Sequence, residues 1–163
     1  MNPPPTPPSR RTTHHAESRA LSIGALTTDW QAIRERAADF PEAAFDFVRE
    51  GLGHTITGLF GTAEPTSSEH GTSRHVTGQQ LCMGLREFAR SRYGALAGAV
   101  LRHWGIRGTE DFGVMVYAMI DRGEMRCSPQ DRFDDFRAVF NFDECFPLLS
   151  ADGTLERPHR TQD

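Results

Sequence analysis

The sequence predicts a mainly α-helical fold, built as one compact helical domain of five to six helices. Three observations predict it. Apolar residues recur at helical spacing from Trp30 onward, residues that cap helices precede several of these stretches, and proline and polar residues gather at the two ends of the chain. An alternative within this class is a winged-helix-like arrangement, in which a short β-hairpin follows the fifth helix.

Length and composition predict a single domain. The 163 residues fit one domain, and their apolar residues are concentrated in the middle of the chain. We expect a disordered Pro-rich leader over residues 1–28, a helical domain over residues 29–149 and a disordered tail over residues 150–163, because the two ends have too few apolar side chains to offset the entropy of ordering them. Within the domain, residues 61–74 are expected to form a mobile loop rich in Gly, Thr and Ser.

The first two helices are predicted from a cap residue and a proline. Asp29 is a suitable N-cap for a helix whose inward face is formed by Trp30, Ile33 and Ala37. Pro41 is expected near the first turn of the second helix, where its missing N–H costs nothing. Gly51 and Gly53 are expected to loosen the end of this second helix.

The third helix has the strongest start signal in the sequence. Thr77 is predicted as its N-cap and Gln80 completes a capping box, while Val76 and Leu81 form a hydrophobic staple around it. A fourth helix is expected from about residue 95 to residue 104, with an inward face made of Leu96, Val100, Leu101 and Trp104.

Gly105 is predicted to end the fourth helix, and Gly123 is predicted to end the fifth. Thr109 is expected to cap the fifth helix, with Glu110 and Asp111 in its first turn, where the helix dipole favours negative charge. The apolar residues of this helix follow strict helical spacing, and they are Phe112, Met115, Val116, Met119 and Ile120.

A short strand is the expected structure of Glu124–Cys127, and it would supply the wing of a winged helix. Ser128 and Pro129 are predicted to start a further short helix, with Asp131 at its third position. Large apolar residues then crowd the chain and are interpreted as the lid of the core, namely Phe133, Phe136, Val139, Phe140, Phe142 and Phe146.

Charge is unevenly distributed along the chain. All eighteen basic residues are arginine, and the net charge is −4. Residues 86–107 carry five arginines and one acidic residue, whereas residues 110–144 carry nine acidic residues and four arginines. Because Trp and Arg dominate the energetics of many interfaces, the candidate interaction surface consists of Arg86, Arg90, Arg102, Trp104 and Arg107. The alternative is that Trp104 fills the core and that the arginines form a solvated, salt-bridged surface.

The sequence lacks the common motifs of catalysis and of cofactor or metal binding. It contains no Gly-x-Ser-x-Gly, Walker or Gly-x-Gly-x-x-Gly motif. Its three cysteines are far apart, and no His or Cys pair has the spacing of a zinc site. Arg86 lies one turn after Cys82 and could lower the pKa of that thiol, although a buried structural thiol is the simpler interpretation. We therefore expect no catalytic residue, no cofactor and no metal.

Four stretches of the chain, taken in order, carry a resemblance to a known family. They are FVREGLGHT at residues 47–55, RHVTGQQL at residues 74–81, WGI and TEDFG within residues 104–113, and FDE before phenylalanine within residues 142–146. Together they resemble an uncharacterised conserved family largely restricted to planctomycete and verrucomicrobial bacteria. The resemblance covers residues 29–147. It implies a bacterial, cytoplasmic protein, and it brings no activity, cofactor or partner with it.

Two functions of different classes fit these observations. The first is a non-enzymatic interaction module that docks a protein partner through its charge-polarised surface. The alternative is a winged-helix-type nucleic-acid-binding regulator, although Glu110 and Asp111 at the start of its recognition helix would repel phosphate groups. A membrane partner is not expected, because no apolar run is long enough to span a bilayer. A deep pocket lined by His54 and His75 would instead favour an enzyme.

Overall fold

The computed structural model describes residues 29–62, 75–148 and 154, and it confirms the mainly α-helical fold. The helices in chain order are α1 (Trp30–Ala37), α2 (Glu42–Phe60), α3 (Gly78–Tyr93), η1 (Gly94–Leu96), α4 (Ala97–His103), α5 (Thr109–Asp121), η2 (Phe133–Phe136) and α6 (Phe142–Cys145), where η marks a short 3-10 helix. The predicted leader, most of the predicted loop and nearly all of the predicted tail lie outside the described residues.

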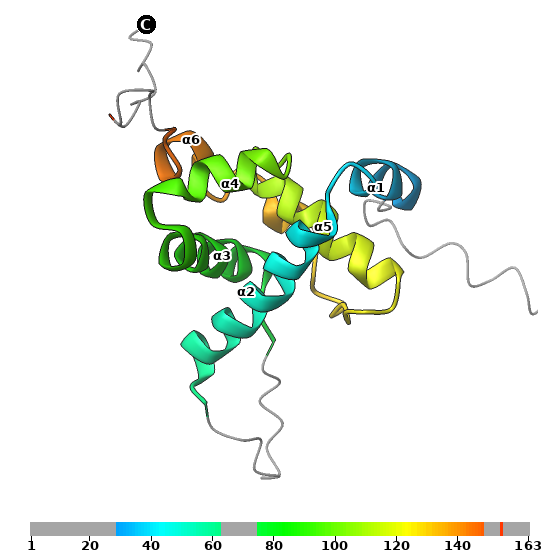
Figure 1. Ribbon diagram of the computed structural model, residues 1–163. Coiled ribbons are helices and arrows are strands. Elements are labelled where there is room, and N and C mark those ends of the chain that lie inside the picture. The colour runs from blue at the N-terminus through cyan, green and yellow to red at the C-terminus, as the bar shows by residue number, and fades with distance from the viewer. Residues whose placement is uncertain (1–28, 63–74, 149–153, 155–163) are drawn as a thin grey trace, which may run out of the picture.

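α5 is the central element of the fold. α1, α2, α3 and η2 all pack against it, and Figure 1 shows it running through the middle of the helices. Its predicted apolar stripe is buried apart from half-buried Ile120, and burial extends to its other faces as well. The buried residues outside the stripe are Thr109, Gly113, Val114, Tyr117 and Ala118.

The starts of the first three helices agree with the sequence. The Asp29 carboxylate accepts hydrogen bonds from two backbone N–H groups in the first turn of α1. Pro41 lies immediately before α2 in an extended conformation. Thr77 and Gln80 form the reciprocal capping box at the start of α3. The caps of α1 and α3 satisfy backbone donors that a helix N-terminus otherwise leaves without partners.

The predicted cap of α5 is wrong by one residue. Gly108 is the N-cap and Thr109 is the first residue of the helix. The Asp111 carboxylate accepts the backbone N–H groups of Arg107 and Gly108, so it does the capping. Thr109 is buried, and its hydroxyl accepts the backbone N–H of Val139 instead. The threonine therefore attaches the later part of the chain to α5.

The second helix is longer than the sequence predicts, because α2 continues through Gly51 and Gly53 to Phe60. Gly51 is buried, and a Cβ atom added there would lie 2.3 Å from Leu85 Cδ2. This glycine therefore lets α3 approach α2 closely and does not end the helix. In Figure 1 the last turns of α2 extend beyond the other helices.

The fourth helix is preceded by a 3-10 turn that the sequence does not predict. The tighter winding of this turn, η1, rotates its residues relative to the stripe of α4. Leu96 is consequently 57% exposed, whereas Leu101 is fully buried. The predicted inward position of Leu96 is therefore wrong. Gly105 and Gly123 have positive φ angles of 83° and 76°, as expected of glycines that end helices.

The expected β-hairpin is absent, since no strand occurs anywhere in the described ranges. After α5 the chain folds back against the helix end, where the N–H groups of Glu124 and Met125 both donate to the carbonyl of Met119. Ser128 begins a turn closed by Asp131 and not a helix. Two of the backbone N–H groups expected to pair in a hairpin are thus already bonded to the end of α5.

The aromatic residues near the end of the domain cover the core as the sequence predicts. Phe136, Phe142 and Phe146 are buried, and the remaining members of the predicted lid are partly buried against them. The rings of Phe142 and Phe146 lie 5.0 Å apart. This lid is held in place by arginines from α3 and α4, which include residues of the predicted interaction surface.

Candidate interaction sites

Two of the predicted interaction residues lie on α3 and contact the aromatic segment at residues 140–146. The Arg86 guanidinium lies over the Phe140 ring, 5.8 Å from its centroid. Arg90 donates a 3.1 Å hydrogen bond to the backbone carbonyl of Cys145. Both guanidinium groups therefore fix the chain's own C-terminal segment against α3.

Arg102 on α4 attaches the same segment more firmly. Its guanidinium donates to the backbone carbonyl of Phe146 at 2.8 Å and to that of Gly98 at 3.2 Å. It also forms a 2.6 Å ion pair with Asp143 and lies over the Phe142 ring. With only 19% of its side chain exposed, Arg102 has its donors directed inside the domain.

Trp104 and Arg107, the last two residues of the predicted interaction surface, differ in burial and in their contacts. Trp104 is half-buried, and its ring lies 5.7 Å from the Phe47 ring and 5.9 Å from the Tyr93 ring, so it packs at the edge of the core. The Arg107 side chain is exposed, and among the described residues its guanidinium has no hydrogen bond or ion pair. Of the five residues, Arg107 therefore has the free cationic group, and the other four are engaged within the domain.

Replacing Arg102 by glutamine is expected to lower the free energy of unfolding by about 1–3 kcal/mol, because the buried Phe146 carbonyl loses a charged donor. Urea denaturation followed by circular dichroism measures the change. Arg107→Gln is the matched control and should change stability by less than about 0.5 kcal/mol, as expected for an exposed side chain without a partner. Equal losses in the two variants would contradict the structural role of Arg102.

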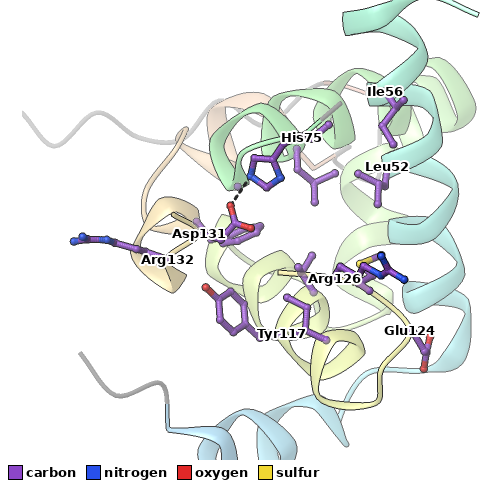
Figure 2. A pocket seen from close by; sticks show the side chains of 15 residues that line it. Leu52, Ile56, His75, Tyr117, Glu124, Arg126, Asp131 and Arg132 are labelled. Atoms are coloured by element: carbon purple, nitrogen blue, oxygen red, sulfur yellow. Dashed lines mark hydrogen bonds and ion pairs between the residues drawn. The ribbon is translucent and has the colours of Figure 1, made fainter. Parts of the chain in front are cut away.

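A cleft of about 290 Å³ opens between α2, α3, α5 and the segment that follows α5. We call it the α2–α5 cleft, and Figure 2 shows the side chains around it. Its volume is at the lower end of the range for small-molecule pockets. Its apolar floor includes Leu52, Ile56, Val116, Ile120, Met125 and Phe136.

The apolar surface of the cleft continues along α2. Leu52 and Ile56 are one helical turn apart and both line the cleft. Leu59 and Phe60 follow one turn later, and they are 47% and 38% exposed. Because residues three and four apart share a helix face, these four side chains form one apolar stripe that runs from the cleft toward the C-terminal end of α2. We call it the α2 stripe.

One rim of the cleft carries a bonded polar group. His75 Nε2 and Asp131 Oδ1 are 2.7 Å apart, and the second carboxylate oxygen of Asp131 accepts the Ser128 N–H. Tyr117 lies on the same side (Figure 2). Burial, with smaller contributions from nearby Cys127 and Asp131, raises the pKa of Tyr117 to about 12. The Tyr117 phenol is therefore neutral at physiological pH.

The other end of the cleft contains an unpaired cation. Glu124 lines the cleft there, but its carboxylate is held 2.7 Å from the Arg49 guanidinium, which α2 supplies. Arg126 lines the same end, is exposed, and has no hydrogen bond or ion pair to any described residue. Figure 2 shows its side chain lying over the cleft beside α2. The free charge at this end is therefore positive, although the chain as a whole has a net charge of −4.

The presence of both His54 and His75 in one pocket would favour an enzyme, but of these two only His75 lines the cleft. His75 lies on its rim, whereas the His54 ring lies 5.3 Å from the Phe88 ring and does not line the cleft. Among the residues that the structure describes, no group of three or more His, Cys, Asp and Glu side chains is placed to hold a metal ion. His75 is instead bound to Asp131 on the rim, and Glu124 is bound to Arg49, which does not line the cleft.

Cys82 is a buried structural thiol. It is fully buried, and burial raises its pKa to about 12, with a smaller contribution from the Glu110 carboxylate. Arg86, one turn later, pairs with Glu87 and does not lower this pKa. Because the thiolate is the reactive form of cysteine, Cys82 lacks the properties of an activated nucleophile.

The three cysteines are expected to react with a disulfide reagent such as DTNB in an order that follows their exposure. In the native protein at pH 8, exposed Cys127 should react first and buried Cys82 should react only on unfolding. Mass spectrometry of the thionitrobenzoate adducts on peptides from protein treated with and without guanidinium chloride identifies which cysteine has reacted. Modification of Cys82 in the native state at a rate similar to that of Cys127 would contradict the buried environment.

The burial of α5 bears on the nucleic-acid alternative. A recognition helix needs an exposed face that fits into a groove of the duplex. α5 is enclosed from Phe112 to Met119, and the hairpin that would form the wing is absent from the described residues. Neither surface that a winged-helix protein uses is therefore available on this part of the chain.

The cleft is the feature that sequence analysis missed. His75 and Asp131 are 56 positions apart, and no local spacing indicates that they meet. Leu52 follows the helical pattern of α2 and is indistinguishable in the sequence from a core residue. Arg126 falls in the segment expected to form a strand. Arg126 can be recognised as an unpaired cation only after the partners of the neighbouring charged side chains are known.

Comparison with known proteins adds no further assignment. The chain matches no protein-family model, no curated protein and no solved structure with significance. The resemblance to a planctomycete and verrucomicrobial family therefore stays a prediction. No helix in the described part of the chain is both long and apolar enough to cross a bilayer.

Proposed function

We propose that this domain is a non-enzymatic interaction module that docks a segment of a protein partner in the α2–α5 cleft. The observation that carries the proposal is the α2 stripe, which joins the apolar floor of the cleft to exposed Leu59 and Phe60. Contiguous exposed apolar surface with a polar rim is typical of protein-binding sites. The charge-polarised surface that includes Arg86 and Arg102 is a weaker site, because these side chains already bind their own chain.

The energetics favour an occupant that lies along α2. Leu59 is 47% exposed and Phe60 is 38% exposed, so covering them would contribute roughly 1 kcal/mol each, somewhat under half of the value for full burial of such side chains. The floor of the cleft adds further apolar contact, and half-buried Met125 can adjust its rotamer to different occupants. A peptide segment fits a cleft of about 290 Å³ that continues into a stripe along α2 better than a rigid domain does.

Site-specific photocrosslinking tests the proposal. A benzoylphenylalanine residue is placed at the position of Leu59, and the full chain is expressed in its native cells and irradiated. The matched control carries the same residue at Ser91, which is exposed on α3 and does not line the cleft. We expect a discrete crosslinked product from the Leu59 position, no such product from Ser91, and loss of the product when Ile56→Asp is added.

Circular dichroism of the Ile56→Asp variant must show native helix content for the loss to be counted. Identical products from the positions of Leu59 and Ser91, or no product from Leu59, would overturn the proposal. The winged-helix alternative is not carried further, because no described surface favours it. An enzymatic function is likewise not proposed, because the His75–Asp131 pair is accompanied by no activated nucleophile among the described cysteines.

A further inference from the structure

The charged side chains that line the α2–α5 cleft are not equally available to a partner. His75 and Asp131 bind each other, and the Glu124 carboxylate is bound by Arg49. Arg132 lines the cleft as well, but its side chain points away from the cleft in Figure 2. Arg126 is thus the charged group that lies over the cleft without an ion pair among the described residues.

The two ends of the cleft therefore differ in the charge that they accept. At the end formed by His75 and Asp131, the carboxylate already accepts hydrogen bonds from the imidazole and from a backbone N–H. At the end formed by α2 and the segment after α5, the Arg126 guanidinium has all of its donors free of protein partners in the described part of the chain. A carboxylate from outside would be complementary to this end.

The apolar part of the cleft has the spacing of a helix face. An amphipathic helix presents apolar residues at i, i+3, i+4 and i+7, and such helices bind in grooves between the helices of other proteins. The α2 stripe presents Leu52, Ile56, Leu59 and Phe60 at i, i+4, i+7 and i+8, which follows the same helical period. A helix packed along α2 would place its apolar side chains between those of the stripe.

Resting on the function proposed above, we infer that the partner segment is an acidic amphipathic helix. Its apolar face covers the α2 stripe and the floor of the cleft, and at least one carboxylate beside that face pairs with Arg126. The same charge distribution orients the helix, because its acidic side chain lies at the α2 end of the cleft and not beside Asp131. The chain therefore selects its partner by an apolar face together with a negative charge at one end.

A display library of random peptides, each long enough for about four helical turns, tests this inference with the full chain as the target. The selected peptides are sequenced and their binding is measured by fluorescence anisotropy. We expect enrichment of apolar residues at helical spacing together with Asp or Glu. Arg126→Glu should weaken binding roughly fivefold to tenfold, mainly through a slower association rate, and high salt should reduce the difference.

Arg107→Glu is the matched control, because it makes the same charge change at another exposed arginine without a partner in the described residues. It should leave peptide affinity unchanged. A selected peptide carrying a photoreactive group should also crosslink to residues that line the cleft, and this readout requires no variant. Lys-rich peptides should be selected in place of acidic ones when Arg126→Glu protein is the target.

The outcomes separate this inference from the proposed function. Peptides that crosslink to the cleft but carry no acidic residue, or that bind Arg126→Glu protein as tightly as the unmodified chain, overturn the inference and leave the docking function intact. Failure to select any peptide, or crosslinks elsewhere on the surface, overturns both. Concentration-dependent self-association that Ile56→Asp abolishes, in the absence of peptide, would identify a second copy of the chain as the occupant and overturn the inference.

Discussion

Phe47→Ala is expected to lower the free energy of unfolding by about 3–5 kcal/mol, the usual range for removing a buried phenylalanine ring. Phe47 is 2% exposed on α2, and four other aromatic rings surround it. The centroids of these rings lie 5.3–6.4 Å from its own, and they belong to Phe88, Tyr93, Trp104 and Phe112. Because these rings come from three other parts of the fold, the cavity left by alanine cannot close by one local movement.

Guanidinium chloride denaturation, followed by the fluorescence of the tryptophans, measures this loss. Phe60→Ala is the matched control on the same helix, because its ring is 38% exposed at the projecting end of α2. That control should cost less than about 1 kcal/mol. A loss of similar size in both variants, or a loss below about 1 kcal/mol for Phe47→Ala, would contradict the central position assigned to this ring.

Gly84→Ala is expected to cost about 1 kcal/mol net, and up to about 2 kcal/mol. A Cβ atom at position 84 would lie 1.9 Å from Thr55 Oγ1 and 2.7 Å from Thr55 Cβ, so α2 and α3 must move apart or Thr55 must change rotamer. Thr55 is buried, and its hydroxyl donates to the Gly51 carbonyl, which restricts that change. Overpacking of a core typically costs about 1–3 kcal/mol, and it outweighs the gain of roughly 1 kcal/mol in helix propensity.

A second glycine in the same pair of helices provides a control, because its replacement by alanine should raise the free energy of unfolding. Gly58 lies in α2 with nothing within 4 Å of an added Cβ, so Gly58→Ala should raise stability by up to about 1 kcal/mol. Thermal unfolding of both variants compares them directly. Adding Thr55→Ala to Gly84→Ala should recover part of the loss, because it removes the nearest clashing atom. Stabilisation by Gly84→Ala alone would show that the helices are not in close contact there.

The local parts of the fold were predictable from the sequence. Asp29 and the Thr77–Gln80 capping box start helices where expected, because a cap bond joins residues only two or three positions apart. Gly105 and Gly123 end helices for an equally local reason, the positive φ that glycine adopts without strain. Such features depend on neighbouring residues alone, and the sequence contains all of the information that they require.

The errors concern residues whose role depends on distant partners. Glycine is common at helix ends, but Gly51 lies inside α2. Leu85 occupies the space that a Cβ atom at this position would need. Glu124 and Met125 were expected to form a strand, but their N–H groups bond to the end of α5. Helix propensity and strand propensity are both weaker than these tertiary interactions, which is why the local pattern fails at these positions.

The partners of the predicted interaction residues were also not predictable, for a related reason. Sequence spacing places Arg86, Arg90 and Arg102 in a basic region, but it cannot show that the chain returns at residues 140–146 to meet them. The alternative interpretation of Trp104, as a core residue, fits its contacts with Phe47 and Tyr93. The proposed site depends on the opposite property, an arginine that no part of the described chain reaches.

The enclosure of α5 has a consequence for the opening motions of the domain. Water reaches a helix amide only when the elements that cover it have separated, and α5 is covered by α1, α2, α3 and η2 together. Its central amides should consequently exchange with deuterium only through complete unfolding, whereas the last turns of α2 should exchange through local fraying. The slowest protons of this helix would then report the stability of the whole domain without any denaturant.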